Sequence, residues 1–138
     1  GYGYSVNVPL YPYTGDETYV WAFRQVVLPL VRAFRPDVMM TQLGVDGYYT
    51  DPLAHLKLTT EGYVALLGEF RGFGIPWVAL GGGGYDPGAV ARCWTLAYGV
   101  MSGQEWPDEL PAGFNERLRV PRLRDAVDPV VPYSPFTG

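Results

Sequence analysis

The sequence predicts an α/β fold in which parallel strands alternate with helices. Three stretches that suit strands, at 4–10, 37–43 and 76–80, are each followed by a segment with helical signals. The second stretch, DVMMTQL, is nearly continuous in apolar residues, which is typical of a parallel strand covered on both faces. Alternation of this kind predicts right-handed crossovers and a parallel sheet with flanking helices.

The first strand and helix are predicted from local signals. YSVNVPL, at 4–10, is rich in Tyr and Val. The next helix is expected to begin in TGDET, where Thr14 and Glu17 have the spacing of a capping box. Pro29 within it predicts a kink. Apolar residues at three- and four-residue steps predict one buried face, formed by Val20, Phe23, Val27, Leu30, Val31 and Phe34.

Two more helices complete the pattern. TTEGYVALLGEFRGFG is expected to be helical, with Thr59 or Thr60 as N-cap and Gly74 as the stop. The strand at 76–80 leads to a last helix at 88–101.

The remainder of the chain, residues 104–138, carries prolines without periodicity. It is expected to be an irregular tail that wraps the surface or is partly disordered. Residues 1–103 are expected to form the core of a single domain. A loose group of arginines in the tail is interpreted as solvated, namely Arg117, Arg119, Arg122 and Arg124.

Composition excludes several classes of function. A net charge of −4 and a pI near 4.8 give no electrostatic footprint for nucleic acid. No apolar run reaches the length needed to span a bilayer, so we expect no membrane association. The one cysteine, Cys93, excludes an intrachain disulfide and suits a reducing compartment, so a cytoplasmic location is expected. Its apolar neighbours predict a buried core thiol.

The stretch VALGGGGYDPG, at 78–88, places four consecutive glycines after a predicted strand. Glycine inside a helix or strand costs roughly 0.5–1 kcal/mol relative to alanine, so this loop needs unusual backbone angles or close approach. Phosphate binding by a nucleotide-binding α/β module is one alternative. Against it, Asp86 stands where G-x-G-x-x-G needs its third glycine, and the Lys of a P-loop is missing.

Two loops are expected to carry the chemistry, because ligands of open parallel sheets bind beyond the carboxyl ends of the strands. GVDGYYTDPL supplies Asp46, and GGGGYD supplies Tyr85. A carboxylate can hold a zinc ion. A phenol that is protonated at neutral pH can donate a hydrogen bond to an oxyanion formed in acyl transfer.

These motifs resemble those of the zinc-dependent histone deacetylase family. YSVNVPL, GVDGYYTDPL, LGGGGY and ARCW occur in the family's order, over about residues 1–103, and the LT at 58–59 also matches. PYTGDETY is most similar to the acetoin-utilisation, AcuC-type branch, and ARCW to the eukaryotic class I enzymes. The resemblance implies an arginase-like α/β fold and hydrolysis of an acetylamide, on an acetylated protein or a small acetylamine. It also implies a Zn²⁺ cofactor, with another divalent metal as the alternative, and, as in some relatives, a bound K⁺.

The resemblance assigns roles to five residues. Asp46 matches one zinc ligand, and Tyr85 matches the residue that polarises the acetyl carbonyl and stabilises the oxyanion. Leu53 matches a wall of the acyl-lysine channel. Gly83 matches a glycine that lines the channel, where a side chain would fill it. Tyr4 matches a position whose backbone carbonyl contacts a monovalent cation in some relatives.

The departure from the family is also informative. Its tandem histidines and its D-x-H zinc ligands lie upstream of the matching region and are absent from this sequence. Zinc catalysis takes about three protein ligands plus water. We therefore expect the chain to be the C-terminal part of a deacetylase domain, inactive by itself. An acetylpolyamine deacetylase and a non-catalytic binder of the same fold are the alternatives within the family.

Four nearby residues receive structural or peripheral roles. Asp51 precedes Pro52 and is expected to be a loop or capping residue. His55 matches no ligand position and is expected to pack or to make hydrogen bonds. Tyr48 and Tyr49 are candidates for the rim of the substrate entrance.

Overall fold

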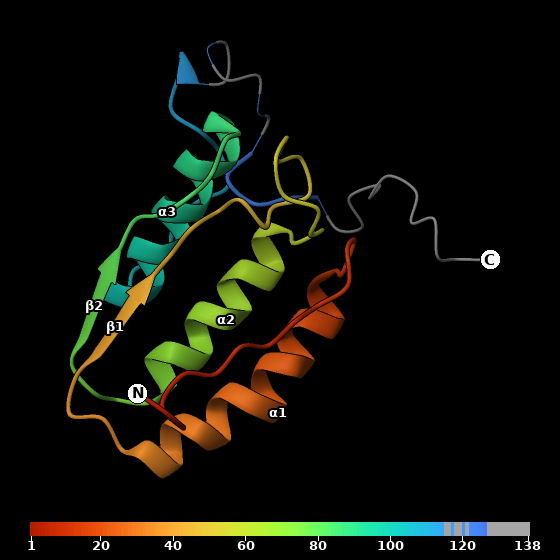
Figure 1. Cartoon of the computed structure of the whole chain (residues 1–138). Helices are drawn as coiled ribbons and strands as arrows, with labels where there is room; N and C mark the ends of the chain where they lie inside the picture. Colours follow the sequence, from red (N-terminus) through yellow and green to blue (C-terminus); the bar gives the residue numbers. More distant parts are fainter. Residues whose placement is uncertain (115–116, 118–119, 121, 127–138) are drawn as a thin grey trace.

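Two parallel strands and three helices alternate along the part of the chain that the computed structural model describes, which comprises residues 1–114, 117, 120 and 122–126. The elements follow in the order α1 (Asp16–Phe34), β1 (Met39–Gln42), α2 (Thr60–Gly72), β2 (Trp77–Leu80) and α3 (Pro87–Ser102). The strands pair in parallel, with Met39 opposite Trp77 and Gln42 opposite Leu80 (Figure 1). The predicted α/β class is confirmed, since a helix connects the parallel neighbours.

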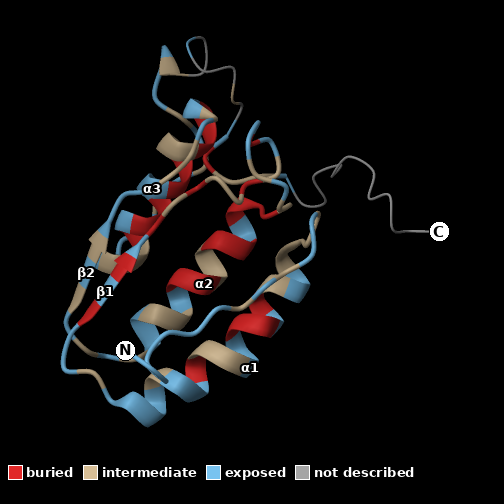
Figure 2. Ribbon diagram, viewed as in Figure 1, coloured by how far each residue is buried: buried red, intermediate tan, exposed pale blue. Residues whose placement is uncertain are grey.

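The helix α2 packs against both α1 and α3. Buried residues lie along α2 and on the parts of its neighbours that cover it (Figure 2). One apolar cluster joins α1 to α2, through Val20, Phe23, Leu28 and Leu66. The other joins α2 and α3 to the segment after β1, through Leu43, Val45, Tyr48, Tyr63, Leu67, Ala89, Cys93 and Ala97. The loop that follows β1 is therefore anchored in the core.

The sheet is covered on one face only by the residues described. Met39 and Thr41 are buried, whereas Met40 between them is 68% exposed. Val78 and Leu80 of β2 are exposed as well. The prediction that β1 is covered on both faces is wrong for this part of the chain, because α2 and α3 pack against a single face.

The helix α1 is confirmed, but its predicted start and buried face need correction. Gly15 is the N-cap and no side chain caps the helix, so the capping box of Thr14 and Glu17 is wrong. The Thr14 hydroxyl instead donates to the carbonyl of Tyr11, at 2.7 Å. Within the predicted buried face, Val20 and Phe23 are buried, whereas Leu30 and Phe34 are exposed.

The predicted strand at 4–10 is wrong. These residues form no strand and are mostly exposed. A strand needs a neighbour to accept and donate its backbone hydrogen bonds, and the described sheet consists of β1 and β2 alone. Residues 3–8 instead lie beside the second half of α1, where they border an apolar groove.

The other helix ends agree with their signals. The Thr59 hydroxyl caps α2 by accepting a hydrogen bond from the Glu61 N–H at 3.1 Å. Gly74 follows the end of α2 with φ +66°, as a glycine stop does. Gly103 ends α3 in the same left-handed conformation, with φ +73°. None of the described helices has the length and apolar character needed to cross a membrane.

The tail returns to the helices after Gly103. Leu123 is buried, and the side chains of Arg124 and Asp108 form an ion pair of 2.8 Å. Arg117 and Arg122 are exposed, as predicted, whereas the Arg124 side chain is 42% exposed and is held in this ion pair. Arg119 and residues 127–138 lie outside the described residues, so the predicted disorder is not tested there.

Candidate functional site

The loops that follow β1 and β2 are joined side by side at the carboxyl end of the sheet. The Leu43 N–H donates to the Leu80 carbonyl at 2.8 Å, and the Val45 N–H donates to the Gly83 carbonyl at 2.6 Å. Parallel pairing therefore continues beyond both strands. It brings Asp46 beside the glycine loop.

The four glycines permit this close approach. A Cβ atom at Gly82 would clash with the Gln42 side chain, and one at Gly83 would clash with the Asp46 carboxylate. Gly84 has φ +147°, and a Cβ there would lie 2.6 Å from Val90 Cγ2. The expected close approach is thus confirmed, and within the described residues the neighbour of Gly83 is Asp46. The assignment of Gly83 to a substrate channel stays a prediction.

Asp46 is half-buried in the loop after β1. Among the described residues, no donor makes a hydrogen bond to its carboxylate, so its oxygens are available to a ligand. Burial, and then the charge of Asp46, raise the pKa of Tyr19, so this phenol of α1 stays protonated near the carboxylate.

A single carboxylate suits zinc but does not complete a zinc site. No group of three or more His, Cys, Asp or Glu side chains able to hold a metal ion exists within the described residues. A zinc site takes about three protein ligands. Asp46 can therefore supply one ligand, and the others would have to come from outside the residues described.

Tyr85 and Leu53 present exposed side chains near this edge of the sheet. They are 54% and 61% exposed, respectively. Their backbone N–H groups both donate to the carboxylate of Asp51, at 2.9 Å each, Tyr85 to Oδ2 and Leu53 to Oδ1. The Ala54 N–H adds a third bond, at 3.1 Å to Oδ1. Asp51 is confirmed as a loop residue that binds backbone, and it connects the two loops.

The charge of Asp51 is favoured by these bonds. Burial alone raises the pKa of its carboxyl group, but the three backbone donors outweigh burial and hold the pKa below its usual value. Asp51 is therefore ionised at neutral pH.

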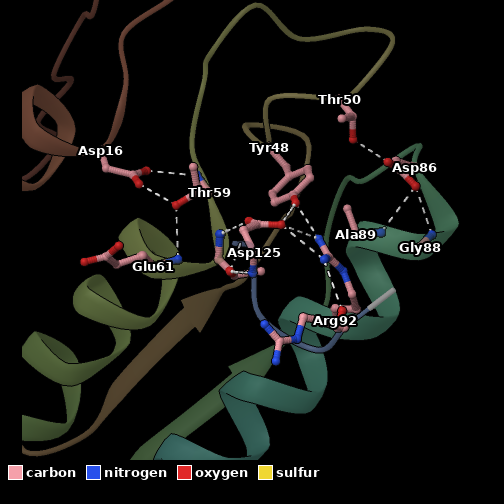
Figure 3. A network of polar contacts seen from close by, with 12 residues as sticks. Asp16, Tyr48, Thr50, Thr59, Glu61, Asp86, Gly88, Ala89, Arg92 and Asp125 are labelled. Atoms are coloured by element: carbon pink, nitrogen blue, oxygen red, sulfur yellow. Dashed lines mark hydrogen bonds and ion pairs between the residues drawn. The ribbon is translucent and has the colours of Figure 1, made fainter. Parts of the chain in front are cut away.

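A second connection joins the loops at the start of α3. The Asp86 carboxylate caps this helix by accepting from the N–H groups of Gly88 and Ala89, at 2.9 and 3.2 Å. The Thr50 hydroxyl donates to the other oxygen of the same carboxylate. Asp86 is thus engaged as a helix cap, as Figure 3 shows.

A buried polar network joins the loop after β1 to α2 and α3 (Figure 3). The Tyr48 hydroxyl donates to Asp125 Oδ1 at 2.5 Å and accepts from Arg92 Nη2. Arg92 and Asp125 form an ion pair of 3.0 Å whose side chains are 6% and 7% exposed. Asp125 Oδ2 also accepts from the Thr60 N–H at 2.8 Å, at the N-terminus of α2. The network therefore ties the tail to α2, α3 and the loop of Asp46.

The prediction that Tyr48 lies at the rim of the substrate entrance is wrong, because its side chain is 4% exposed and bonds to this network. Tyr49 is half-buried and packs against the apolar cluster that joins α2 and α3 to the segment after β1. Burial raises the pKa of Tyr48, and the hydrogen bond to Asp125 raises it further. Burial of Asp125 raises the pKa of its carboxyl group. The Thr60 N–H, Tyr48 and Arg92 outweigh burial and together hold this pKa below its usual value.

Sequence reasoning missed the network formed by Tyr48, Thr60, Arg92 and Asp125. Arg92 was the available signal, since an arginine among the apolar residues of a buried helix needs an anionic partner. No spacing rule identifies Asp125 as that partner, because it lies 33 residues further along an irregular segment.

Three other predicted residues are placed as follows. Tyr4 is 78% exposed and its ring meets the edge of Phe34, at a centroid distance of 6.3 Å, near the end of α1 that leads into β1. The N-terminus and the end of α1 lie near the start of β1 (Figure 1), whereas Asp46 follows the other end of this strand. The His55 ring packs edge-to-face against Tyr13, as expected. Cys93 is fully buried, which confirms the core thiol, and burial raises its pKa to about 12.

Comparison with known proteins connects this geometry to a family. The histone deacetylase domain family matches residues 1–101. The acetoin utilization protein AcuC of Bacillus subtilis (strain 168) is 36% identical over 146 residues, which cover 99% of this chain and 38% of that protein. Histone deacetylase clr6 of Schizosaccharomyces pombe is 34% identical over 119 residues, with 86% of this chain and 29% of that protein covered.

A solved structure extends the likeness to the fold. The crystal structure of the HDA15 HD domain superimposes with a TM-score of 0.71 at 33% sequence identity, over 74% of this chain and 29% of that one. The chain thus spans about a third of the length of these relatives, at 38%, 29% and 29%. The incomplete, arginase-like α/β fold implied by the motifs is confirmed. This chain belongs to the histone deacetylase family.

Proposed function

We propose that this chain is the C-terminal part of a zinc-dependent deacetylase domain that hydrolyses the acetylamide of N-acetyl-lysine in proteins. One observation carries the proposal: the candidate zinc ligand and the candidate oxyanion donor lie on two loops that are joined to each other. Asp46 packs against Gly83, and Tyr85 follows two residues later. Their loops lie at the carboxyl ends of parallel strands, where open α/β sheets bind ligands.

Three residues of this chain have defined tasks in that reaction. The Asp46 carboxylate holds Zn²⁺ as one of several ligands, the others being supplied by parts of the protein outside these residues. A zinc ion held there would supply Lewis-acid polarisation of the acetyl carbonyl and would lower the pKa of a bound water molecule. The Tyr85 hydroxyl donates a hydrogen bond to the oxygen that becomes negative. Leu53 offers an exposed apolar side chain to the alkyl part of the acyl-lysine.

The remaining assignments belong to the same proposal. Gly83 lines the substrate channel, the Tyr4 carbonyl contacts a K⁺ ion, and the protein acts in the cytoplasm. The isolated chain is inactive, because Asp46 is the one matched zinc ligand among its described residues. Acetylpolyamines are the alternative substrates, and a non-catalytic binder is the alternative role.

A nucleotide-binding role has less support. A helix N-terminus binds phosphate through its free N–H groups. At the start of α3 the Asp86 carboxylate already accepts from two of these groups, those of Gly88 and Ala89, and its negative charge would repel phosphate.

The test is the variant Tyr85→Phe in the complete protein. We expect kcat on an acetyl-lysine peptide to fall about 100-fold or more, as loss of one oxyanion donor does, with zinc content unchanged. Tyr11→Phe is the matched control, since Tyr11 is also exposed but lies in the N-terminal segment. Unchanged turnover in Tyr85→Phe would refute the role of this phenol. An acetylpolyamine assayed in parallel decides between the two substrate classes.

A further inference from the structure

The Asp51 carboxylate is a shared anchor for two residues of the proposed site. It is 8% exposed and accepts three backbone hydrogen bonds. One oxygen holds Leu53 and Ala54 on its own loop, and the other holds Tyr85 on the glycine loop. The relative position of Leu53 and Tyr85 therefore depends on one carboxylate.

The side chain of Tyr85 is not fixed by hydrogen bonds of its own among the described residues. Its side chain is half-exposed, and among the described residues its hydroxyl makes no hydrogen bond. Four glycines precede it, and glycine restricts its own backbone less than any other residue. The flanking residues are held by other bonds, at the Gly83 carbonyl and at the Asp86 carboxylate. The bond to Asp51 is the one made by the backbone N–H of Tyr85 itself, so it fixes the point from which the phenol projects.

Asp51 also connects Tyr85 to Asp46 through a short and ordered piece of chain. The Tyr48 N–H donates to the Val45 carbonyl at 3.0 Å, and the Asp51 N–H donates to the Tyr48 carbonyl at 2.9 Å. Two successive turns therefore separate Asp46 from Asp51. The Tyr48 side chain between them is fixed in the buried network.

We propose that Asp51 is a positioning residue for the deacetylase reaction, because its carboxylate sets the place of Tyr85 relative to Leu53 and Asp46. This inference rests on the function proposed above for Tyr85. Asp51 itself need not touch the substrate. A misplacement of about 1 Å at a reacting group can lower a rate about 100-fold, so the bond matters for catalysis as well as for folding.

The experiment is a double-mutant cycle in the complete protein, with Asp51→Asn, Tyr85→Phe and the double variant. Asparagine keeps the size of the side chain but presents an NH₂ group that cannot accept from a backbone N–H. We expect Asp51→Asn to lower kcat about 10- to 100-fold and to leave zinc content unchanged. In the Tyr85→Phe background, the same substitution should lower kcat less than twofold, because the phenol it positions is already absent.

A matched control separates positioning from loss of stability. Asp16 is another carboxylate that binds backbone and hydroxyl groups, from the Thr59 N–H and Oγ1, and it lies at the junction of α1 and α2. We expect Asp16→Asn to lower the melting temperature without a change in kcat. If Asp51→Asn does not accumulate as folded protein, Asp51→Glu retains the charge, moves the carboxylate, and enters the same cycle.

The outcomes are distinct. Independent, multiplicative effects of Asp51→Asn and Tyr85→Phe on kcat would overturn the positioning role while leaving the proposed function intact. Full activity of Asp51→Asn would overturn it as well. Unchanged turnover in Tyr85→Phe would instead refute the proposed role of Tyr85, and this inference with it.

Discussion

The two ends of one short loop, around Asp46 and around Tyr48, differ in how their polar groups are satisfied. The Tyr48 hydroxyl is buried and bonds to Arg92 and Asp125. The Asp46 carboxylate is half-buried and, among the described residues, accepts no hydrogen bond. Buried groups need all their partners to avoid a desolvation cost, whereas a group that binds a ligand must keep its lone pairs free. Tyr48 thus stabilises the fold, whereas Asp46, two residues earlier, keeps oxygens that can bind a ligand.

The largest expected effect is a loss of stability when the buried network around Tyr48 is broken. Asp125→Ala leaves the buried Arg92 guanidinium without its anion and the Thr60 N–H without an acceptor. Removing one partner of a buried ion pair costs about 3–5 kcal/mol. We expect a loss of that size in the free energy of unfolding of the complete protein, measured by urea denaturation. A loss below about 1 kcal/mol would show that the network contributes little.

The pair of variants Asp125→Ala and Arg92→Met sharpens the test. When both are combined, no charge is left alone in the interior. The double variant should therefore be less destabilised than the sum of the two single variants. Additive losses would mean that the two side chains act independently.

The next largest effect is expected where the glycine loop meets Asp46. Gly83→Ala places a Cβ atom against the Asp46 carboxylate, which must move. Overpacking of this kind costs about 1–3 kcal/mol, and here we expect it to appear as weaker zinc binding, by about 10-fold, in a competition titration with a chelator. Gly68→Ala in α2 is the matched control, because no atom lies within 4 Å of its added Cβ. Equal zinc affinity in the two variants would contradict the proposed role of Asp46 as a zinc ligand.

The contrast between these loops also explains how far sequence reasoning reaches. The run of four glycines predicted a close approach, because glycine has no Cβ atom to prevent one. The structure shows this approach between Gly83 and Asp46. Thr59 and Gly74 mark helix ends through bonds to their own neighbours. The missed features depend on partners distant in sequence: the strand at 4–10 has no neighbour to pair with among the described strands, and Arg92 finds Asp125 in a tail without periodicity.

The residues of the proposed site also divide into those that local sequence predicts and those that depend on distant partners. The motifs around Asp46 and Tyr85 carry the resemblance to the family, because each motif is a short continuous stretch of sequence. The bonds of Asp51 to both loops could not be predicted, because they depend on the register between two loops that lie 34 residues apart. Leu30 and Phe34 were misplaced for a related reason, since periodicity gives the face of a helix but not the length over which another element covers it.

A smaller effect is expected from acid. The folded state holds the pKa values of Asp51 and Asp125 below their usual value of 3.8. Groups with a lowered pKa in the folded state stabilise it above their unfolded pKa, and this stabilisation is lost as the pH falls through the folded pKa. The free energy of unfolding should therefore decline below about pH 4. In Asp125→Asn the decline should be shallower, and an identical slope would exclude Asp125 as a contributor.

The smallest expected effect comes from the tail's second ion pair, which repeats the comparison between buried and exposed charge. Arg124 and Asp108 lie 2.8 Å apart, close to the 3.0 Å of Arg92 and Asp125, but their side chains are 42% and 34% exposed. Water screens an exposed pair, which contributes about 0–1 kcal/mol. We expect Asp108→Ala to lower the free energy of unfolding by less than about 1 kcal/mol, and added salt to reduce that loss further. A loss as large as that of Asp125→Ala would mean that distance, and not burial, decides how strongly these pairs hold the tail.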